Sequence, residues 1–456
     1  MALRSTSPLD GSTLSVFKEW NGYKLREALD EVGVGAAEWH ALALAERAER
    51  LVQVAALLRS DSEELSRLIT FEMGKLRREA LQEVEDCARL CEQLARAAGD
   101  YLGQESLVDS DGRRVTLDQI PLGIVLAITP RYAPFWLVFR VAMPALLAGN
   151  GVVLKHASAV TQCAMAIDEL LREGLGAPDA FRTLQINAAQ VPSVIAAPMV
   201  SAVSFCGSGS AGREVAALAG EEGKKVTLHL GGSDPFIVLA DADLERAVEA
   251  AFVARFANAG QRAAAAKRFI IVEELADTFI ERLLQPVESE LIYGDPMKEA
   301  TRFAPLASHE LRDRLHRQVS GSRTQGARVV TGCMPGEPPG AFYQGSILDH
   351  VALGMPAYDE ELFGPVAAII RVAGEAEAVE IANHAPIGIG ASVWSADPER
   401  ALRIGQGLRC GQVYINTPVA EDPAIPAGGV GPSGFGRLLG RAGCREFTGS
   451  KALIFS

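Results

Sequence analysis

Between residues 151 and 230, short apolar segments alternate with amphipathic ones, and this alternation limits the possible folds more than any other feature. The apolar segments have the length and composition of β-strands and lie at 151–155, 181–187, 202–206 and 224–230. The intervening segments repeat apolar residues at helical spacing, which predicts helices at 159–174, 191–198 and 210–223. Strands that alternate with helices form a parallel sheet covered on both faces, so the predicted fold class is α/β, doubly wound.

The rest of the chain adds a helical N-terminal part and a second α/β unit. Residues 41–102 show helical periodicity, and the period changes to that of strands at 113–129. A second alternation of strands and helices begins near residue 233 and continues to residue 417. Two α/β units that join near residue 232 are the simplest organisation for a chain of this length.

Charge and composition exclude several classes of protein. The net charge is −13, whereas nucleic-acid binding needs a basic surface, so we expect no nucleic-acid partner. The N-terminal segment lacks the apolar core of a signal peptide, and no apolar stretch is long enough to span a bilayer. We therefore expect a cytoplasmic protein without a membrane partner. The cysteines form no Cys-x-x-Cys pair and the histidines show no ligand spacing, so we predict no metal.

The turn after the predicted 202–206 strand carries glycines in the spacing Gly-x-Gly-x-x-Gly. Gly207, Gly209 and Gly212 stand between a predicted strand and a predicted helix. In that context glycines let the backbone approach a phosphate, and the helix N-terminus offers free amide groups. The motif also fits an ordinary glycine-rich turn, and no acidic residue about 20 positions further on stands out as a ribose ligand.

Six segments, in their order and spacing, carry a resemblance over essentially the whole chain. They read PLGIVLAITPRYAPFWLVFRVAMPALLAGNGVVLKHAS, VTLHLGGSDPFIVLADADLERAV, FANAGQRAAAAKRFIIVEE, YDEELFGPVAAIIRV, GQVYIN and AGGVGPSGFGRLLGRAGCREFT. The chain resembles the aldehyde dehydrogenase superfamily in these segments. The segments LGGSDPFIVL and KHAS are similar to those of its short succinate-semialdehyde dehydrogenase group.

The resemblance implies a subunit of three parts. They are an NAD(P)-binding domain of residues 1–108 and 123–232, to which 418–440 return, a catalytic-type domain of residues 233–417, and a β-hairpin oligomerisation flap of residues 109–122 and 441–456. The tail ends in an apolar strand, Ala452-Leu453-Ile454-Phe455, which would be an exposed edge in a monomer. The family uses such a tail to extend the sheet of a neighbouring subunit, so we expect a homodimer or homotetramer.

The resemblance also carries over a cofactor site whose positions this sequence keeps. The matching residues are Lys155 for the adenosine ribose, Gly207, Ser208 and Gly212 for the pyrophosphate, Glu361 for the nicotinamide ribose and Phe363 beside it. Family members that favour NAD tend to carry an acid three residues after the lysine, which would repel a 2′-phosphate. Here that residue is Ser158, so we expect NADP to be tolerated or preferred over NAD.

The three catalytic positions of the family hold other residues in this chain. In the family, a cysteine after Gly-Gln-x attacks the aldehyde, a glutamate before Leu-Gly-Gly activates water, and an asparagine stabilises the oxyanion. The matching residues here are Ala263, His229 and Tyr132, respectively. Ala263 has no heteroatom and cannot form an acyl intermediate.

These replacements lead us to expect a pseudoenzyme that keeps an NAD(P) site and serves binding or assembly. An alternative is an NAD(P)H-dependent oxidoreductase with changed chemistry, in which hydride passes directly to a C=N or C=O bond. His229 or Tyr132 would then donate the proton, and Arg262 would hold an anionic substrate. A third interpretation is aldehyde oxidation through the hydrated substrate, with His229 as the base.

Two more features of the sequence concern the ligand. Arg131, Arg262 and a protonated His229 replace neutral or acidic groups, which favours a small-molecule ligand that is an anion. Alternatively, these arginines pair with local carboxylates. Cys206 stands where the family has a small or hydroxyl residue near the nicotinamide, so it is either a relocated thiol or an inert buried cysteine.

Overall fold

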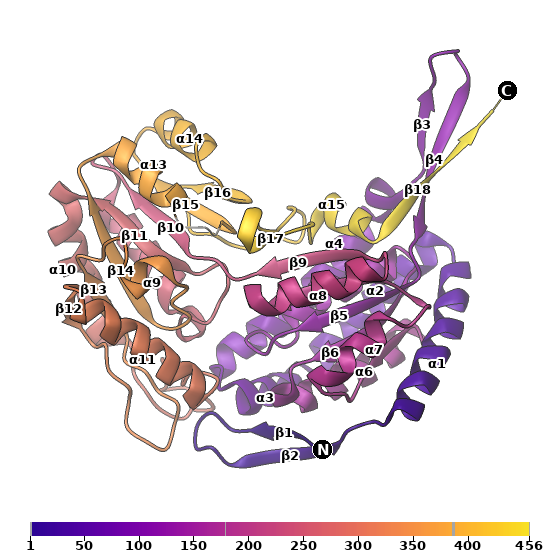
Figure 1. The fold of residues 1–456 in the computed structure, drawn as a ribbon, viewed down its shortest axis with the longest axis horizontal. Helices are drawn as coiled ribbons and strands as arrows, with labels where there is room; N and C mark the ends of the chain where they lie inside the picture. Colours follow the sequence, from indigo (N-terminus) through magenta and orange to yellow (C-terminus); the bar gives the residue numbers. More distant parts are fainter. Residues whose placement is uncertain (1, 178, 385–387, 456) are drawn as a thin grey trace.

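The computed structural model describes residues 2–177, 179–384 and 388–455, and most of its strands belong to two β-sheets that each carry helices. Figure 1 shows the two sheets side by side, with β5 to β9 in one and β10 to β16 in the other. Met1, the first residue of the predicted NAD(P)-binding domain, and Ser456, the last residue of the predicted flap, lie outside the described residues.

The first sheet has six strands in the order β17-β9-β8-β5-β6-β7. Its strands are β5 (Ile124–Thr129), β6 (Gly151–His156), β7 (Phe181–Thr183), β8 (Val200–Gly207), β9 (Lys225–Leu230) and β17 (Gly434–Phe435). All neighbours are parallel except β17, which pairs antiparallel with β9. The carboxyl ends of the parallel strands therefore meet at one edge of the sheet.

Helices cover both faces of this sheet. They are α1 (Gly22–Ala41), α2 (Leu44–Ser60), α3 (Ser62–Met73), α4 (Arg77–Leu102), α5 (Trp136–Leu147), α6 (Thr161–Leu175), α7 (Val191–Ile195) and α8 (Gly209–Glu221). Ile124 and Leu126 of β5 join a core with α1, α7 and α8, whereas Val125 and Ala127 join a core with α2 to α6. Because successive side chains of a strand point to opposite faces, this division confirms the predicted doubly wound α/β fold class.

The second sheet has seven strands in the order β12-β13-β14-β11-β10-β15-β16. They are β10 (Asp234–Val238), β11 (Ala266–Val272), β12 (Arg328–Thr331), β13 (Ser346–Asp349), β14 (Val366–Val372), β15 (Gly390–Trp394) and β16 (Gln412–Ile415). Its helices are α9 (Leu244–Phe256), α10 (Glu273–Glu290), α11 (His309–Thr324), α12 (Pro356–Asp359), α13 (Glu375–His384) and α14 (Pro398–Gln406). The strands are parallel apart from β12.

The chain passes between the two sheets twice. It leaves the first sheet at the end of β9 and enters the second at β10, which begins only four residues later, at Asp234. After β16 it returns, because β17 pairs with β9 through Gly434 and His229. The carboxyl end of β9 therefore lies where both parts of the molecule meet.

A third sheet projects from the body of the molecule (Figure 1). It contains β3 (Glu105–Val108), β4 (Arg114–Pro121) and β18 (Thr448–Ile454), in the order β18-β4-β3, and α15 (Gly440–Glu446) precedes β18. The hairpin begins with β3 at Glu105, a few residues before the start of the predicted flap at residue 109.

Two elements differ from the expectations drawn from the sequence. An antiparallel hairpin of β1 (Ala2–Thr6) and β2 (Thr13–Lys18) was not predicted. The predicted strand at 181–187 is ordered as a strand only over β7 (Phe181–Thr183), because the backbone turns away and the Gln185 carbonyl accepts a hydrogen bond from the Trp20 amide. Among the described residues, no helix has the length and hydropathy needed to cross a bilayer.

Candidate active site

The predicted cofactor-binding residues of the first unit lie together at the carboxyl edge of its sheet. Lys155 lies near the end of β6, and Ser158 opens the short 3-10 helix Ser158–Val160 that follows. Gly207 ends β8, and Ser208 caps the N-terminus of α8. Ligands of open parallel sheets bind at this edge, outside the carboxyl ends of the strands.

The turn from β8 into α8 has the geometry that a dinucleotide phosphate needs. The Ser208 hydroxyl accepts a hydrogen bond from the Ala211 amide at 3.4 Å. A Cβ on Gly212 would lie 2.5 Å from Leu230 Cδ2, so the helix packs close to β9 only because residue 212 is glycine. The α8 N-terminus therefore presents amide groups and the positive end of the helix dipole at the sheet edge.

The surroundings of Lys155 also suit a phosphorylated ribose. Its ammonium group donates to the His156 carbonyl at 2.7 Å, and no carboxylate pairs with it in the described part of the chain. The side chain at Ser158 is a neutral hydroxyl. Neither position therefore places a negative charge that would repel a 2′-phosphate, and these residues fit NADP as well as NAD.

Two of the predicted cofactor-binding residues, Glu361 and Phe363, belong to the second unit and contact residues of the first. Glu361 accepts a hydrogen bond from the Gly232 amide at 3.3 Å and pairs with the Lys267 ammonium at 3.2 Å. The Phe363 ring lies edge-on to Tyr132, with ring centroids 5.3 Å apart. The structure thus brings both residues to the junction of the units, next to the carboxyl end of β9.

The loop before β11 holds Arg262 and Ala263 in a fixed conformation. Gly260 has a left-handed backbone with φ of 73°, and a Cβ there would lie 2.5 Å from the Gly364 carbonyl oxygen. The buried Arg255 guanidinium donates to the Gly260 carbonyl at 2.6 Å. Gly260 and its hydrogen bond from Arg255 therefore fix the positions of Arg262 and Ala263.

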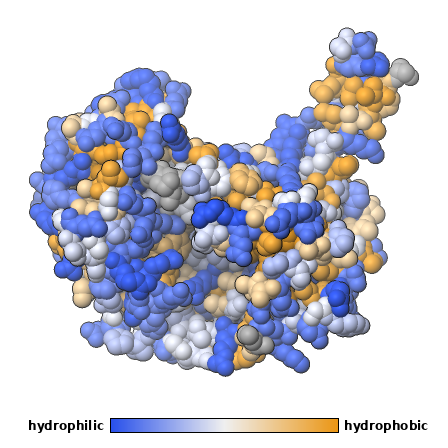
Figure 2. Space-filling view, in the orientation of Figure 1, coloured by the Kyte–Doolittle hydropathy of each residue, from blue (hydrophilic) through white to orange (hydrophobic). Residues whose placement is uncertain are grey.

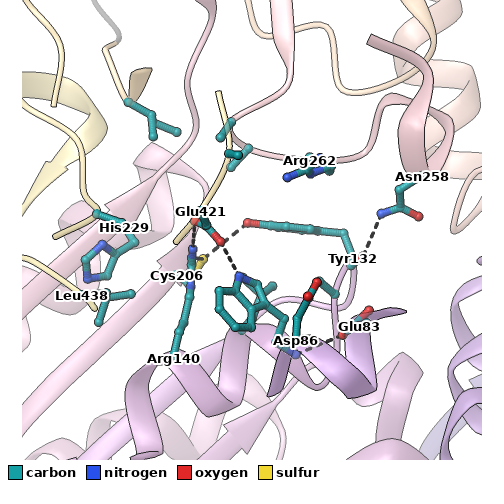
Figure 3. Close-up of a pocket in the computed structure, with 18 of the residues that line it drawn as sticks. Glu83, Asp86, Tyr132, Arg140, Cys206, His229, Asn258, Arg262, Glu421 and Leu438 are labelled. Atoms are coloured by element: carbon teal, nitrogen blue, oxygen red, sulfur yellow. Dashed lines mark hydrogen bonds and ion pairs between the residues drawn. The ribbon is translucent and has the colours of Figure 1, made fainter. Parts of the chain in front are cut away.

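A cavity of about 400 Å³ opens at the junction of the two units. Figure 3 shows part of its lining, which comes from α4, α5, the sheet edge and two loops of the second half of the chain. The residues that matter for chemistry are Tyr132, Arg140, Cys206, His229, Arg262 and Ala263. The structure therefore gathers all four predicted catalytic-site residues in one space, together with Arg140 and Cys206.

Arg140 is the centre of a polar cluster in this cavity. Its guanidinium lies 2.6 Å from a Glu421 oxygen and 3.4 Å from the Cys206 sulfur. The other Glu421 oxygen accepts a hydrogen bond from the Trp136 indole. The Tyr132 hydroxyl lies 3.7 Å from the Cys206 sulfur (Figure 3). A thiol, a phenol and an ion pair are thus in direct contact.

Several polar atoms of the lining lack partners. Among the described residues, eleven buried side-chain nitrogen or oxygen atoms have no hydrogen-bond partner, and four of them belong to this lining: Glu79 Oε2, Arg140 Nε, His229 Nε2 and Asn258 Oδ1. Buried polar atoms in native proteins are nearly always bonded, so a cluster of exceptions requires an explanation. These four atoms are covered by neighbouring groups, so a ligand in the cavity would reach them only after the surrounding side chains move.

Electrostatics determine the protonation of these groups. Burial and, to a lesser extent, the Arg140 and Arg437 charges lower the pKa of His229 to about 3, so its imidazole is neutral at neutral pH. Burial raises the pKa of the Tyr132 phenol well above its usual range, so it keeps its proton. Burial also raises the pKa of the Cys206 thiol, while Arg140 and the Tyr132 hydrogen bond act in the opposite direction.

The sequence predicted three cations around the ligand: Arg131, Arg262 and a protonated His229. This prediction is wrong for His229 and for Arg131. His229 carries no charge because burial holds it neutral. Arg131 donates to the Ser308 hydroxyl at 2.8 Å and does not line the cavity, although its neighbour Tyr132 does. Arg262 lines the cavity, and no carboxylate pairs with it in the described segments.

Sequence reasoning missed Arg140 and Glu421. Arg140 had a signal, because it is the single charged residue of α5, whose sequence WLVFRVAMPALL is otherwise apolar. A charged residue in a buried helix is rare and calls for a partner or a ligand. The sequence carried no signal for Glu421, since this residue lies in an irregular loop 281 residues away from its partner Arg140.

Comparison with known proteins identifies the family. The model of the aldehyde dehydrogenase family matches residues 1–453. The chain belongs to the aldehyde dehydrogenase family. The NADP(+) succinate-semialdehyde dehydrogenase of Deinococcus radiodurans is 40% identical to it, over 98% of this chain and 93% of that protein. The NAD(P)+ succinate semialdehyde dehydrogenase of Escherichia coli K12 is 39% identical, over 97% and 96%.

A solved structure extends the likeness to three dimensions. Succinic semialdehyde dehydrogenase from Streptococcus pyogenes, in complex with NADP+, matches with a TM-score of 0.96 at 32% identity and covers 99% of each chain. The resemblance to the succinate-semialdehyde dehydrogenase group is thereby confirmed. The expected cofactor, NADP or NAD, is the cofactor named for these relatives.

The predicted function requires correction. The expectation of a pseudoenzyme is wrong, because relatives of 39–40% identity over nearly the whole chain are named as aldehyde-oxidising enzymes. The same names give no support to the alternative of C=N or C=O reduction. The prediction gave most weight to the loss of the nucleophile at position 263, although a relocated thiol at Cys206 was one of the interpretations left open. The cavity instead brings a thiol from β8, an imidazole from β9 and a guanidinium from α5 into one space.

Proposed function

We propose that this chain is an oxidoreductase that converts a small aldehyde bearing a carboxylate into the corresponding acid, with NADP+ as the oxidant. The relatives support the reaction, since they are named for succinate semialdehyde and NADP+ or NAD(P)+. The observation that carries the substrate class is Arg262, an unpaired guanidinium among the described residues of the cavity lining. A guanidinium binds a carboxylate through two parallel hydrogen bonds.

NADP+, when bound, would accept the hydride. We assign its binding to residues at the sheet edge and at the junction: Lys155 and Ser158 for the adenosine ribose and its phosphate, Gly207, Ser208 and Gly212 for the pyrophosphate, and Glu361 and Phe363 for the nicotinamide ribose. The close packing of Gly212 on Leu230 and the neutral side chain at Ser158 support this assignment.

We also infer that Tyr132, His229 and Ala263 stand at the positions of the family's asparagine, glutamate and cysteine. The support is their motif context and their shared place in the lining. The Tyr132 phenol stays protonated and can donate to a substrate oxygen, and the neutral His229 imidazole can accept a proton. The methyl group of Ala263 can do neither, so covalent chemistry must use another side chain.

The organisation of the subunit is part of the same proposal. We assign residues 1–108, 123–232 and 418–440 to the NAD(P)-binding domain and 233–417 to the catalytic-type domain. The flap of residues 109–122 and 441–456 would join subunits into a homodimer or homotetramer. We place this assembly in the cytoplasm.

The proposed substrate class can be tested by changing Arg262. The wild-type protein should form NADPH from succinate semialdehyde with a higher kcat/KM than from butanal, which has the same chain length and no carboxylate. Arg262→Gln should lower kcat/KM for the semialdehyde by about 10- to 100-fold, the value of a charge-assisted contact, mainly through KM. The rate with butanal should change little.

Arg131→Gln is the matched control, because Arg131 precedes Tyr132 but bonds to Ser308 outside the cavity. It should leave the preference between the two aldehydes as in the wild type. The absence of NADPH formation from any aldehyde would contradict the proposed reaction. Equal losses for both aldehydes in Arg262→Gln would contradict the proposed substrate class alone.

A further inference from the structure

We propose that Cys206 is the nucleophile that forms the covalent adduct with the aldehyde, an inference that rests on the proposed function. Cys206 lies at the carboxyl end of β8, in the middle of the first sheet. Of the seven cysteines, all within the described residues, it is the one whose side chain lines the cavity.

The contacts of the sulfur suit a nucleophile better than a packing residue. Arg140 Nη2 lies 3.4 Å from the Cys206 sulfur and the Tyr132 hydroxyl lies 3.7 Å from it (Figure 3). Both groups can donate hydrogen bonds to a thiolate. A cation within contact distance lowers the pKa of a thiol, and here it offsets part of the rise that burial causes at Cys206.

A second observation is an unpartnered donor beside this contact. Arg140 is 7% exposed, and its Nε–H group has no acceptor in the described structure, although the rest of the guanidinium bonds to Glu421 and Cys206. An oxygen attached to the carbon that sulfur attacks would lie near this guanidinium. Because Nε is itself covered, the donors that face such an oxygen are Arg140 Nη2 and the Tyr132 hydroxyl, which both contact the sulfur.

His229 adds an unpartnered acceptor on the same face. It pairs in register with Cys206 across parallel strands β8 and β9, so both side chains emerge from the same face of the sheet. It is 7% exposed, and its Nε2 atom has no partner among the described groups. With its pKa lowered to about 3, this imidazole is a weak base, so it orients water and takes its proton only as the water attacks the thioester carbon.

The addition step balances without any further reactant. The sulfur electron pair forms a C–S bond to the aldehyde carbon, and the C=O π pair moves onto oxygen. The thiol proton ends on that oxygen, carried by the Tyr132 hydroxyl, which contacts the sulfur. The product is a neutral thiohemiacetal. Because burial raises the pKa of Cys206, the resting group is a thiol, and this transfer accompanies the attack.

The fate of the adduct follows from the proposed function. NADP+, when bound, would supply the hydride acceptor. As the C–H bond breaks, the thiohemiacetal hydroxyl releases its proton to solvent through the Tyr132 hydroxyl, and the carbon becomes a thioester. Water then adds to the thioester carbon and gives its proton to His229, and the C–S bond breaks with its electron pair returning to sulfur. His229 then gives this proton to the sulfur, which restores the imidazole and the Cys206 thiol, and the acid is released.

The first test uses the full-length protein without added cofactor. Iodoacetamide labelling at alkaline pH, followed by peptide mass mapping, should modify Cys206 slowly, because its thiol is buried and its pKa is raised. Succinate semialdehyde should slow this labelling further. Succinate, which has the same carboxylate but no aldehyde carbon, should protect much less. Equal labelling rates of Cys206 with and without the semialdehyde would overturn the proposal.

The second test measures NADPH formation by variants. Cys206→Ser and Cys206→Ala should each lower kcat by at least about 10³-fold, as expected for the loss of a nucleophile. Cys410→Ser, which changes a half-buried cysteine outside the cavity lining, should retain wild-type activity. Activity of Cys206→Ala within threefold of the wild type would overturn the proposal.

The two tests separate the inference from the function on which it rests. Protection of Cys206 by the semialdehyde in a protein that forms no NADPH would support the nucleophile and contradict the proposed oxidation. NADPH formation that survives Cys206→Ala would support the oxidation and contradict the nucleophile. The labelling result also remains decisive if the variants fail to fold.

Discussion

The protonation of His229 is determined by burial between charged neighbours. Burial, followed by Arg140 and Arg437, lowers its pKa to about 3 from an ordinary value of about 6.5. Between these two values the unfolded chain binds a proton at this residue and the folded chain does not. The contribution of neutral His229 to the free energy of unfolding is therefore fully present above about pH 6.5, and it is lost as the pH falls toward 3.

His229→Gln should make the protein less sensitive to acid. Glutamine keeps a polar side chain and does not titrate, so the loss of unfolding free energy from pH 7 to pH 5 should be smaller by about 2 kcal/mol than in the wild type. Urea unfolding at the two pH values measures this difference. His309→Gln, at a half-buried histidine outside the cavity lining, is the control and should lose as much stability as the wild type. A wild-type acid response in His229→Gln would contradict the assigned protonation.

At the residue scale, motif spacing predicted which side chains gather but not how they point. Tyr132, His229, Arg262 and Ala263 lie in one cavity, as their motif positions imply. Arg131 does not, because consecutive residues of an irregular loop can point in opposite directions and the sequence carries no record of that choice. The Arg140–Glu421 contact was equally hidden, since it depends on the path of a distant loop.

The Arg140–Glu421 pair joins two elements that lie far apart in the sequence, and the Trp136 indole of the same helix donates to the same carboxylate. Arg140 belongs to α5, and Glu421 lies in the loop between β16 and β17. Their side chains are 8% and 18% exposed, so both charges are largely removed from water. A buried charge that loses its partner is costly, whereas removal of both charges restores neutrality.

A double-mutant cycle tests how strongly this pair holds the loop to α5. Glu421→Gln leaves the Arg140 charge without its partner and should lower the free energy of unfolding by about 3 kcal/mol. Arg140→Met should also destabilise the protein. The double variant should lose less than the sum of the two, with a coupling of about 2 kcal/mol in urea unfolding. Strictly additive losses would show that the pair does not hold the loop.

Elements with strong apolar periodicity were predictable, and weak ones were not. The central strands of the first sheet, such as β5, β6 and β8, are buried on both faces, and their apolar runs indicated them in the sequence. The β1–β2 hairpin is largely exposed, as the pattern of β2 shows, and has no such run. The predicted strand at 181–187 ends early because its second half bonds to the segment near Trp20, a contact that periodicity does not encode.

At the scale of the whole molecule, the projecting sheet of β3, β4 and β18 leaves apolar side chains exposed to solvent in a single chain. Figure 2 shows apolar residues gathered on this sheet. Its exposed apolar side chains are Leu107, Val108, Ile120, Leu453, Ile454 and Phe455. β18 pairs with β4 on one side only, so its other edge keeps free backbone hydrogen-bonding groups. An exposed apolar edge strand of this kind favours association with another chain.

We therefore expect a homodimer or homotetramer that depends on β18. Light scattering should give a mass that is a multiple of 48.4 kDa for the wild type. Ile454→Lys places a charge on the apolar edge, where desolvation opposes burial, and should shift the distribution toward smaller species. Val34→Lys, at an exposed valine of α1 far along the chain from this sheet, is the matched control and should keep the wild-type mass. A wild-type protein that remains at 48.4 kDa at high concentration would contradict the expected assembly, because the apolar sheet would then be stable in water without a partner.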